Sequence, residues 1–84
     1  MSEHITERRI HARHRVFKGG RLAFHDGGTV SCTVRNLSTG GARVDVENPR
    51  ALPEQFTLYI DSDHFMRQCH PVWRHDTTVG VAFD

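Results

Sequence analysis

Three arginines near the start of this 84-residue chain have the chemistry and spacing to bind a planar, anionic ligand. Arg8 and Arg9 are adjacent, and Arg13 follows Arg9 by four residues. A guanidinium can grip guanine O6 and N7 with two parallel donors, clasp a phosphate, or lie flat on a base. Lys18 is the single lysine among 11 basic residues, and this excess of arginine favours planar recognition. Because the spacing is also common by chance, a solvated basic tail is the alternative interpretation.

A second group of residues, Asn36, Ser38 and Gly41, lies where one predicted strand gives way to the next. The Asn36 amide carries donors and acceptors and can pair with the edge of a base. The Ser38 hydroxyl follows two residues later, and the glycines at positions 40 and 41 would let a ligand approach the backbone closely. The alternative is a local turn in which these side chains satisfy only neighbouring backbone amides.

From residue 16 onward the sequence predicts six short strands and no major helix. Apolar and polar residues alternate in each segment, which is typical of strands with one buried face, and Cys32 shares the inward parity of its apolar neighbours. Asp26-Gly27 predicts a hairpin turn, and Pro71 predicts an edge position or a bulge. Closing the sheet into a barrel leaves no bare edge. We therefore expect a flexible basic arm over residues 1–15 and an all-β, six-stranded antiparallel barrel over residues 16–84.

Together, the arginines and the polar turn resemble the PilZ domain family of β-barrel receptors. The family pattern is Arg-Arg-x-x-x-Arg, followed by Asp-or-Asn-x-Ser-x-x-Gly. Every residue of that pattern is present here, as Arg8-Arg9-x-x-x-Arg13 and Asn36-x-Ser38-x-x-Gly41. The resemblance covers nearly the whole chain, from about residue 7 to residue 83. Family members often add a C-terminal helix after the last strand, and we expect none here because the sequence stops at Asp84.

The resemblance implies a receptor for the bacterial second messenger cyclic di-GMP and a role for each motif residue. The three arginines of the arm would grip guanine edges and phosphates or stack on a base. Asn36 and Ser38 would read the other guanine from the barrel surface, and Gly41 would keep that surface flat. The arm would close over the ligand, which can be an intercalated dimer. This closure would change a surface that an unidentified downstream protein partner senses.

Composition and motifs argue against several other functions. The seven histidines and two cysteines lack the spacing of a metal site, so neither a metal nor a cofactor is expected. We expect no enzymatic activity, because no nucleophile elbow, phosphate-binding loop or zinc-protease motif is present. No stretch approaches the length of a membrane span and the N-terminus has no signal-peptide pattern, which indicates a cytoplasmic module.

Two rival functions stay open at this stage. One is a PilZ-like module that docks proteins without binding a nucleotide. The other is a small oligonucleotide-binding barrel, which would need a basic groove and exposed aromatic side chains. Net charge is only +1, and the chain after residue 21 is mildly acidic. Phe24, Phe56 and Phe83 have inward parity, which leaves few aromatic side chains to stack on bases, so the oligonucleotide interpretation is disfavoured. Trp73, near the end of a strand, is expected in the core or at the barrel rim.

Overall fold

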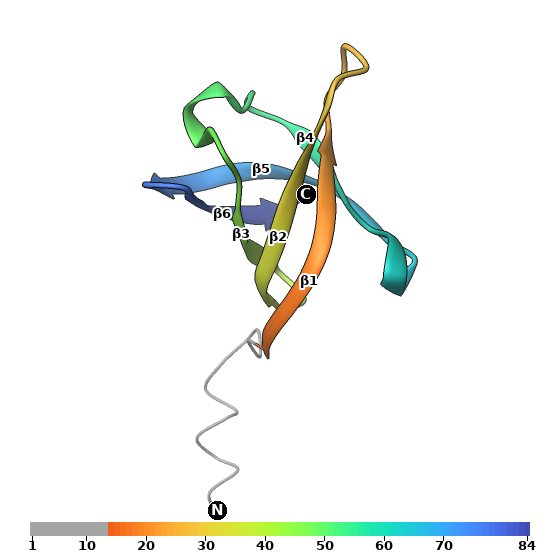
Figure 1. The fold of residues 1–84 in the computed structure, drawn as a ribbon. Helices are drawn as coiled ribbons and strands as arrows, with labels where there is room; N and C mark the ends of the chain where they lie inside the picture. Colours follow the sequence, from red (N-terminus) through yellow and green to blue (C-terminus); the bar gives the residue numbers. More distant parts are fainter. Residues whose placement is uncertain (1–13) are drawn as a thin grey trace, which may run out of the picture.

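The chain forms a closed six-stranded antiparallel β-barrel, as the alternating sequence pattern predicted (Figure 1). A computed structural model describes residues 14–84, so Arg8, Arg9 and Arg13 lie outside the described residues. The strands are β1 (His14–Ala23), β2 (Thr29–Leu37), β3 (Gly41–Asp45), β4 (Phe56–Ile60), β5 (Phe65–His75) and β6 (Thr78–Phe83). Around the barrel they follow the order β1-β2-β3-β6-β5-β4. β1 thus begins two residues before position 16, where we expected the barrel to start.

Alternation along the strands fills the barrel with apolar side chains. In β4, for example, Phe56, Leu58 and Ile60 are buried while the residues between them are partly exposed. The buried core consists of Leu22, Cys32, Val34, Val44, Val46, Leu52, Phe56, Leu58, Ile60, Cys69, Val79 and Val81. The inward parity of Cys32 is therefore confirmed. Burial raises the pKa of the Cys32 thiol to about 11 and that of Cys69 to about 12, so both thiols are protonated at neutral pH.

The predicted Asp26-Gly27 hairpin turn joins β1 to β2. Gly27 has a φ of +96°, a conformation that glycine adopts without steric cost. The Asp26 carboxylate accepts a hydrogen bond of 2.8 Å from the Gly28 N–H, and the Phe24 N–H donates to the Gly28 carbonyl at 2.8 Å. These bonds satisfy the turn's backbone locally, which explains why a short sequence signal was enough to predict it.

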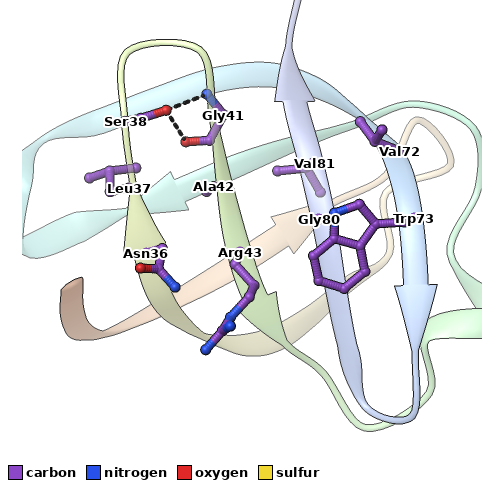
Figure 2. A pocket seen from close by; sticks show the side chains of 10 residues that line it. All are labelled: Asn36, Leu37, Ser38, Gly41, Ala42, Arg43, Val72, Trp73, Gly80 and Val81. Atoms are coloured by element: carbon purple, nitrogen blue, oxygen red, sulfur yellow. Dashed lines mark hydrogen bonds between the residues drawn. The ribbon is translucent and has the colours of Figure 1, made fainter. Parts of the chain in front are cut away.

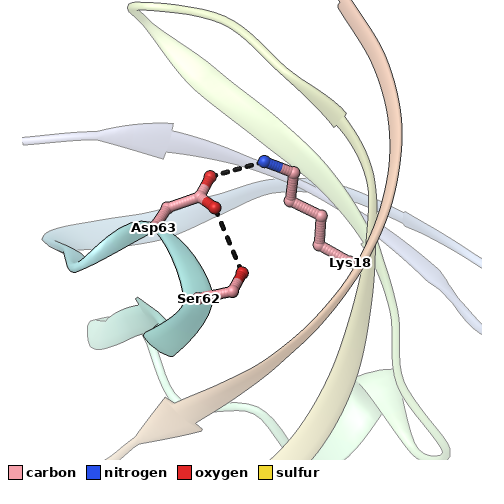
Figure 3. Close-up of polar contacts among 3 residues, drawn as sticks. All are labelled: Lys18, Ser62 and Asp63. Atoms are coloured by element: carbon pink, nitrogen blue, oxygen red, sulfur yellow. Dashed lines mark hydrogen bonds and ion pairs between the residues drawn. The ribbon is translucent and has the colours of Figure 1, made fainter.

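Ion pairs tie β1 to the turn that follows its neighbour β4, where the backbone pairing between these two strands is short. β1 pairs with β4 over only three register positions. Beyond them, a 3-10 turn called η2 (Asp61–Asp63) lies against β1, and Lys18 Nζ is 2.6 Å from an Asp63 carboxylate oxygen (Figure 3). Arg21 lies 3.3 Å from Asp61 in the same turn. The hydrogen bond from Lys18 is the main reason that the pKa of Asp63 lies below its ordinary value.

Pro49 and Pro71 both lie where the regular sheet is interrupted. The Pro-containing segment between β3 and β4 forms the 3-10 turn η1 (Pro49–Ala51) rather than a strand. Pro71 lies inside β5 beside a bulge, which the sequence had offered as one of two possibilities. Arg74 of β5 donates to the carbonyls of Pro49 at 3.0 Å and Leu52 at 3.2 Å, and so holds the η1 segment against the barrel. Within residues 14–84, no helix is both long enough and apolar enough to cross a membrane.

Candidate functional site

Five residues in register across neighbouring strands form a row on the outer face of the barrel. Arg15 of β1 pairs with Asn36 of β2, and Asn36 pairs with Arg43 of β3. Arg43 pairs with Gly80 of β6, and Gly80 pairs with Trp73 of β5. Because directly opposite residues of an antiparallel pair point to the same face, their side chains share one surface. The cross-strand row therefore gathers two guanidiniums, an amide and an indole from distant parts of the sequence.

A β-bulge turns Asn36 toward this outer face. Val34 is fully buried, and a simple period of two would place Asn36 on the same inner face. However, the pairs Val34–Val44 and Asn36–Arg43 leave Arg35 as an extra residue in β2. One extra residue reverses the direction of every side chain that follows it. The bulge therefore exposes an amide that strand parity alone would have buried.

A second bulge does the same for Trp73. The pairs Pro71–Val81 and Trp73–Gly80 leave Val72 as the extra residue of β5. Trp73 consequently lies on the outer face with 46% of its surface exposed, and not in the core, which was one of the two places expected for it. Bulges of this kind commonly re-aim side chains beside binding sites.

The indole of Trp73 lies directly on β6 because Gly80 has no side chain. A Cβ at Gly80 would lie 2.2 Å from Trp73 Nε1, so any larger residue would displace the ring. Figure 2 shows the indole beside Gly80, while Asn36 and Arg43 extend toward the same side of β2 and β3. Together these groups border a pocket of about 230 Å³. Its lining residues are Asn36, Leu37, Ser38, Gly41, Ala42, Arg43, Val72, Trp73, Gly80 and Val81.

The Ser38 hydroxyl holds the β2–β3 turn in shape. It accepts a hydrogen bond from the Gly40 N–H at 3.2 Å. It also accepts one from the Gly41 N–H at 3.1 Å and donates to the Gly41 carbonyl at 3.2 Å, as Figure 2 shows. A hydroxyl has one donor and two acceptor positions, so these three bonds use its full capacity. Ser38 thus makes the local turn described above as the alternative interpretation. A direct contact with a ligand would have to replace one of these bonds.

Gly41 allows β3 to approach β6 closely. A Cβ at this position would lie 2.3 Å from the backbone carbonyl oxygen of Val81, which has no side-chain freedom to move away. Glycine is therefore required here by the packing of the barrel wall, whatever its effect on the flatness of the pocket.

Two polar side chains at the pocket are free to bind a ligand. Within residues 14–84, neither the Asn36 amide nor the Arg43 guanidinium has a side-chain hydrogen bond or ion pair. The neighbouring Arg35, in contrast, is 2.9 Å from a carboxylate oxygen of Asp45. An unpaired guanidinium beside an unpaired amide can bind a phosphate or the donor and acceptor edge of a purine.

The structure thus brings Asn36, Ser38 and Gly41 into one pocket and adds Arg43 and Trp73, which sequence reasoning had not assigned to the site. Arg43 could have been found, because it follows Gly41 by two residues on the outward parity of a regular strand. Trp73 could not have been found from strand parity, because the direction of its side chain depends on the bulge at Val72. In the described part of the chain, no three histidine, cysteine, aspartate or glutamate side chains cluster closely enough to hold a metal ion.

Comparison with known proteins agrees with this architecture. No curated protein sequence matches the chain. The family model of the PilZ domain matches residues 7–84, which is nearly its whole length. That match includes the arm motif, the polar turn and all six strands, and the chain therefore belongs to the PilZ domain family.

Proposed function

We propose that this protein is a non-enzymatic receptor for cyclic di-GMP and that the ligand binds across the outer face of β2, β3, β6 and β5. PilZ domains generally bind cyclic di-GMP. The observation that carries the proposal for this chain is the cross-strand row itself. It places the unpaired Asn36 amide and Arg43 guanidinium beside the exposed Trp73 indole, around one pocket.

The chemistry of the row fits a guanine nucleotide. The Trp73 ring offers a flat surface on which a base can stack, and such stacking contributes about 1–3 kcal/mol per base. Arg43 can bind guanine O6 and N7 or a phosphate, while Asn36 offers an amide to the base edge. At about 230 Å³ the pocket is smaller than the range of roughly 300–1,000 Å³ typical of ligand pockets. It would therefore hold part of the ligand, and further contacts must come from elsewhere.

The arm is the natural source of those contacts. Arg13 precedes the row residue Arg15 by two positions, so chain connectivity keeps their Cα atoms within about 7 Å. Arg9 and Arg8 precede Arg13 by four and five positions and can reach the ligand if the arm folds back. In this proposal the arm closes over cyclic di-GMP, and the altered surface signals to a protein partner in the bacterial cytoplasm.

Calorimetric titration with cyclic di-GMP tests the proposal. Arg9→Ala, Arg13→Ala and Arg43→Ala should each weaken binding by about 10- to 100-fold, because each removes charge-assisted hydrogen bonds worth about 1.5–3 kcal/mol. Arg50→Ala is the matched control, since Arg50 is exposed in η1 and lines no pocket of the row. Unchanged affinity in the three variants would refute the site.

A parallel titration separates the rival binding function. Single-stranded DNA in low salt should bind more weakly than cyclic di-GMP, because the described surface offers a short row of polar groups and no long basic groove. Tighter binding of the DNA, with a steep loss of affinity as salt rises, would favour an oligonucleotide-binding barrel. In NMR spectra, the amides of residues 7–15 should shift when cyclic di-GMP is added if the arm closes over it.

A further inference from the structure

A second concave surface adjoins the row on the β1 side and contains the most exposed aromatic side chain of the described chain. Phe17 is 77% exposed, the highest value among the exposed large apolar residues of the described chain. It lies in a third bulge, where Val16 and Phe17 of β1 oppose the single residue Arg35 of β2. The concave surface measures about 480 Å³ and is lined by Arg15, Val16, Phe17, Arg35, Asn36 and Arg43.

Three guanidiniums line this surface together with Phe17, and they differ in their partners. Arg35 is 2.9 Å from Asp45, and its guanidinium carbon lies 5.3 Å from the centre of the Phe17 ring. This contact uses one face of the ring, and the high exposure of Phe17 leaves aromatic surface open to a ligand. Arg15 and Arg43 have no side-chain hydrogen bond or ion pair with any residue between positions 14 and 84. The surface therefore combines an open aromatic ring with two uncompensated positive charges.

We propose that the Phe17 surface is a second purine-nucleotide subsite, in which a base stacks on Phe17 and its phosphate lies between Arg15 and Arg43. The inference rests on the proposed function and extends it, because Asn36 and Arg43 line both this surface and the pocket beside Trp73. In Figure 2 these two side chains extend from β2 and β3 toward the same side. The two aromatic rings, Trp73 and Phe17, thus flank one continuous polar strip.

Size and polarity favour a nucleotide over a protein partner at this surface. A stable protein interface buries about 800 Å² on each side and normally has several buried apolar anchors. Here a single exposed ring lies among cations. That combination suits a stacked base and a phosphate, since aromatic rings and guanidiniums are the groups that hold nucleotides without a deep cavity.

Titration of the full chain with cyclic di-GMP, followed by both heat and Trp73 fluorescence, tests the second subsite. Trp73 is the only tryptophan of the sequence, so its quenching reports the first pocket alone. Phe17→Leu removes the ring and should weaken binding by about ten- to hundredfold. Phe17→Tyr keeps the ring and should bind like the unaltered protein. Met66→Ala, which changes another exposed apolar side chain outside both surfaces, should have no effect.

The stoichiometry identifies the source of the second base. A fall from two ligands to one per chain in Phe17→Leu would mean that the subsite holds a second ligand molecule. A weaker affinity at constant stoichiometry would mean that it holds the second guanine of the same molecule. Unchanged affinity and stoichiometry in Phe17→Leu, with Trp73 still quenched, would overturn the subsite and leave the proposed function intact. If the unaltered protein gives neither heat nor quenching, the proposed function fails and the subsite fails with it.

Discussion

Adding one methyl group at Gly80 tests the site without altering any polar side chain. The new Cβ would lie 2.2 Å from Nε1 and 2.3 Å from Cε2 of Trp73. Favourable contacts between such atoms begin at about 3.5 Å, so the ring must move by more than about 1 Å. Because Trp73 is 46% exposed, the indole can swing into solvent and the backbone need not move. We therefore expect Gly80→Ala to keep its free energy of unfolding within about 1 kcal/mol of the unaltered protein.

Ligand binding should respond much more strongly than stability does. Without the positioned indole, a base loses stacking worth about 1–3 kcal/mol, which corresponds to binding about 5- to 150-fold weaker in calorimetry. Trp73→Ala should give the same loss, and the double variant should add little, because both changes remove the same surface. If Gly80→Ala binds cyclic di-GMP as tightly as the unaltered protein while Trp73 fluorescence shows a displaced ring, the indole has no part in the site.

Gly41→Ala is the matched control for this substitution. Its new Cβ would lie 2.3 Å from the Val81 carbonyl oxygen, and this atom belongs to the barrel backbone. Since no side chain can rotate away, β3 and β6 must separate, and we expect a loss of about 1–3 kcal/mol in the free energy of unfolding, measured in urea. Equal stabilities of the two glycine variants would contradict the distinction between a movable indole and a fixed carbonyl.

Two further predictions concern the turn and the core. Ser38→Ala should lower the free energy of unfolding by about 1–2 kcal/mol and weaken ligand binding through the altered turn; lost binding at unchanged stability would instead indicate direct ligand contact. Burial raises the pKa values from 9.0 to about 11 for Cys32 and about 12 for Cys69, so the native state keeps its thiol protons to higher pH than the unfolded state does. The thiols' contribution to the free energy of unfolding should therefore be fully present below pH 9. It should fall as the pH rises above 9, by up to about 1.4 kcal/mol per pH unit for each thiol. Urea unfolding at pH 8 to 10 should show a shallower fall in Cys69→Ala.

The architecture could be predicted from the sequence because its determinants are local. A period of two in apolar residues indicates a strand with one buried face, and Asp26-Gly27 indicates a turn whose bonds form within a few residues. Six such segments without a helix leave few ways to cover every apolar face, so a closed barrel could be predicted. The motif that includes Asn36 could likewise be found, since it depends only on residue order.

The outward direction of Asn36 and Trp73 was decided by the pairing between strands in the tertiary structure. Strict alternation along β2 and β5 would place Asn36 and Trp73 on the inner face, whereas bulges at Arg35 and Val72 turn both outward. A bulge exists only in relation to a partner strand, because it is one residue more than the neighbour can pair with. Pro71 offered a bulge in β5 as one of two possibilities, but the sequence of neither strand says which residue its partner leaves unpaired. The chain's residue pattern therefore determined a barrel and its motif, and the pairing between strands determined which face carries the candidate site.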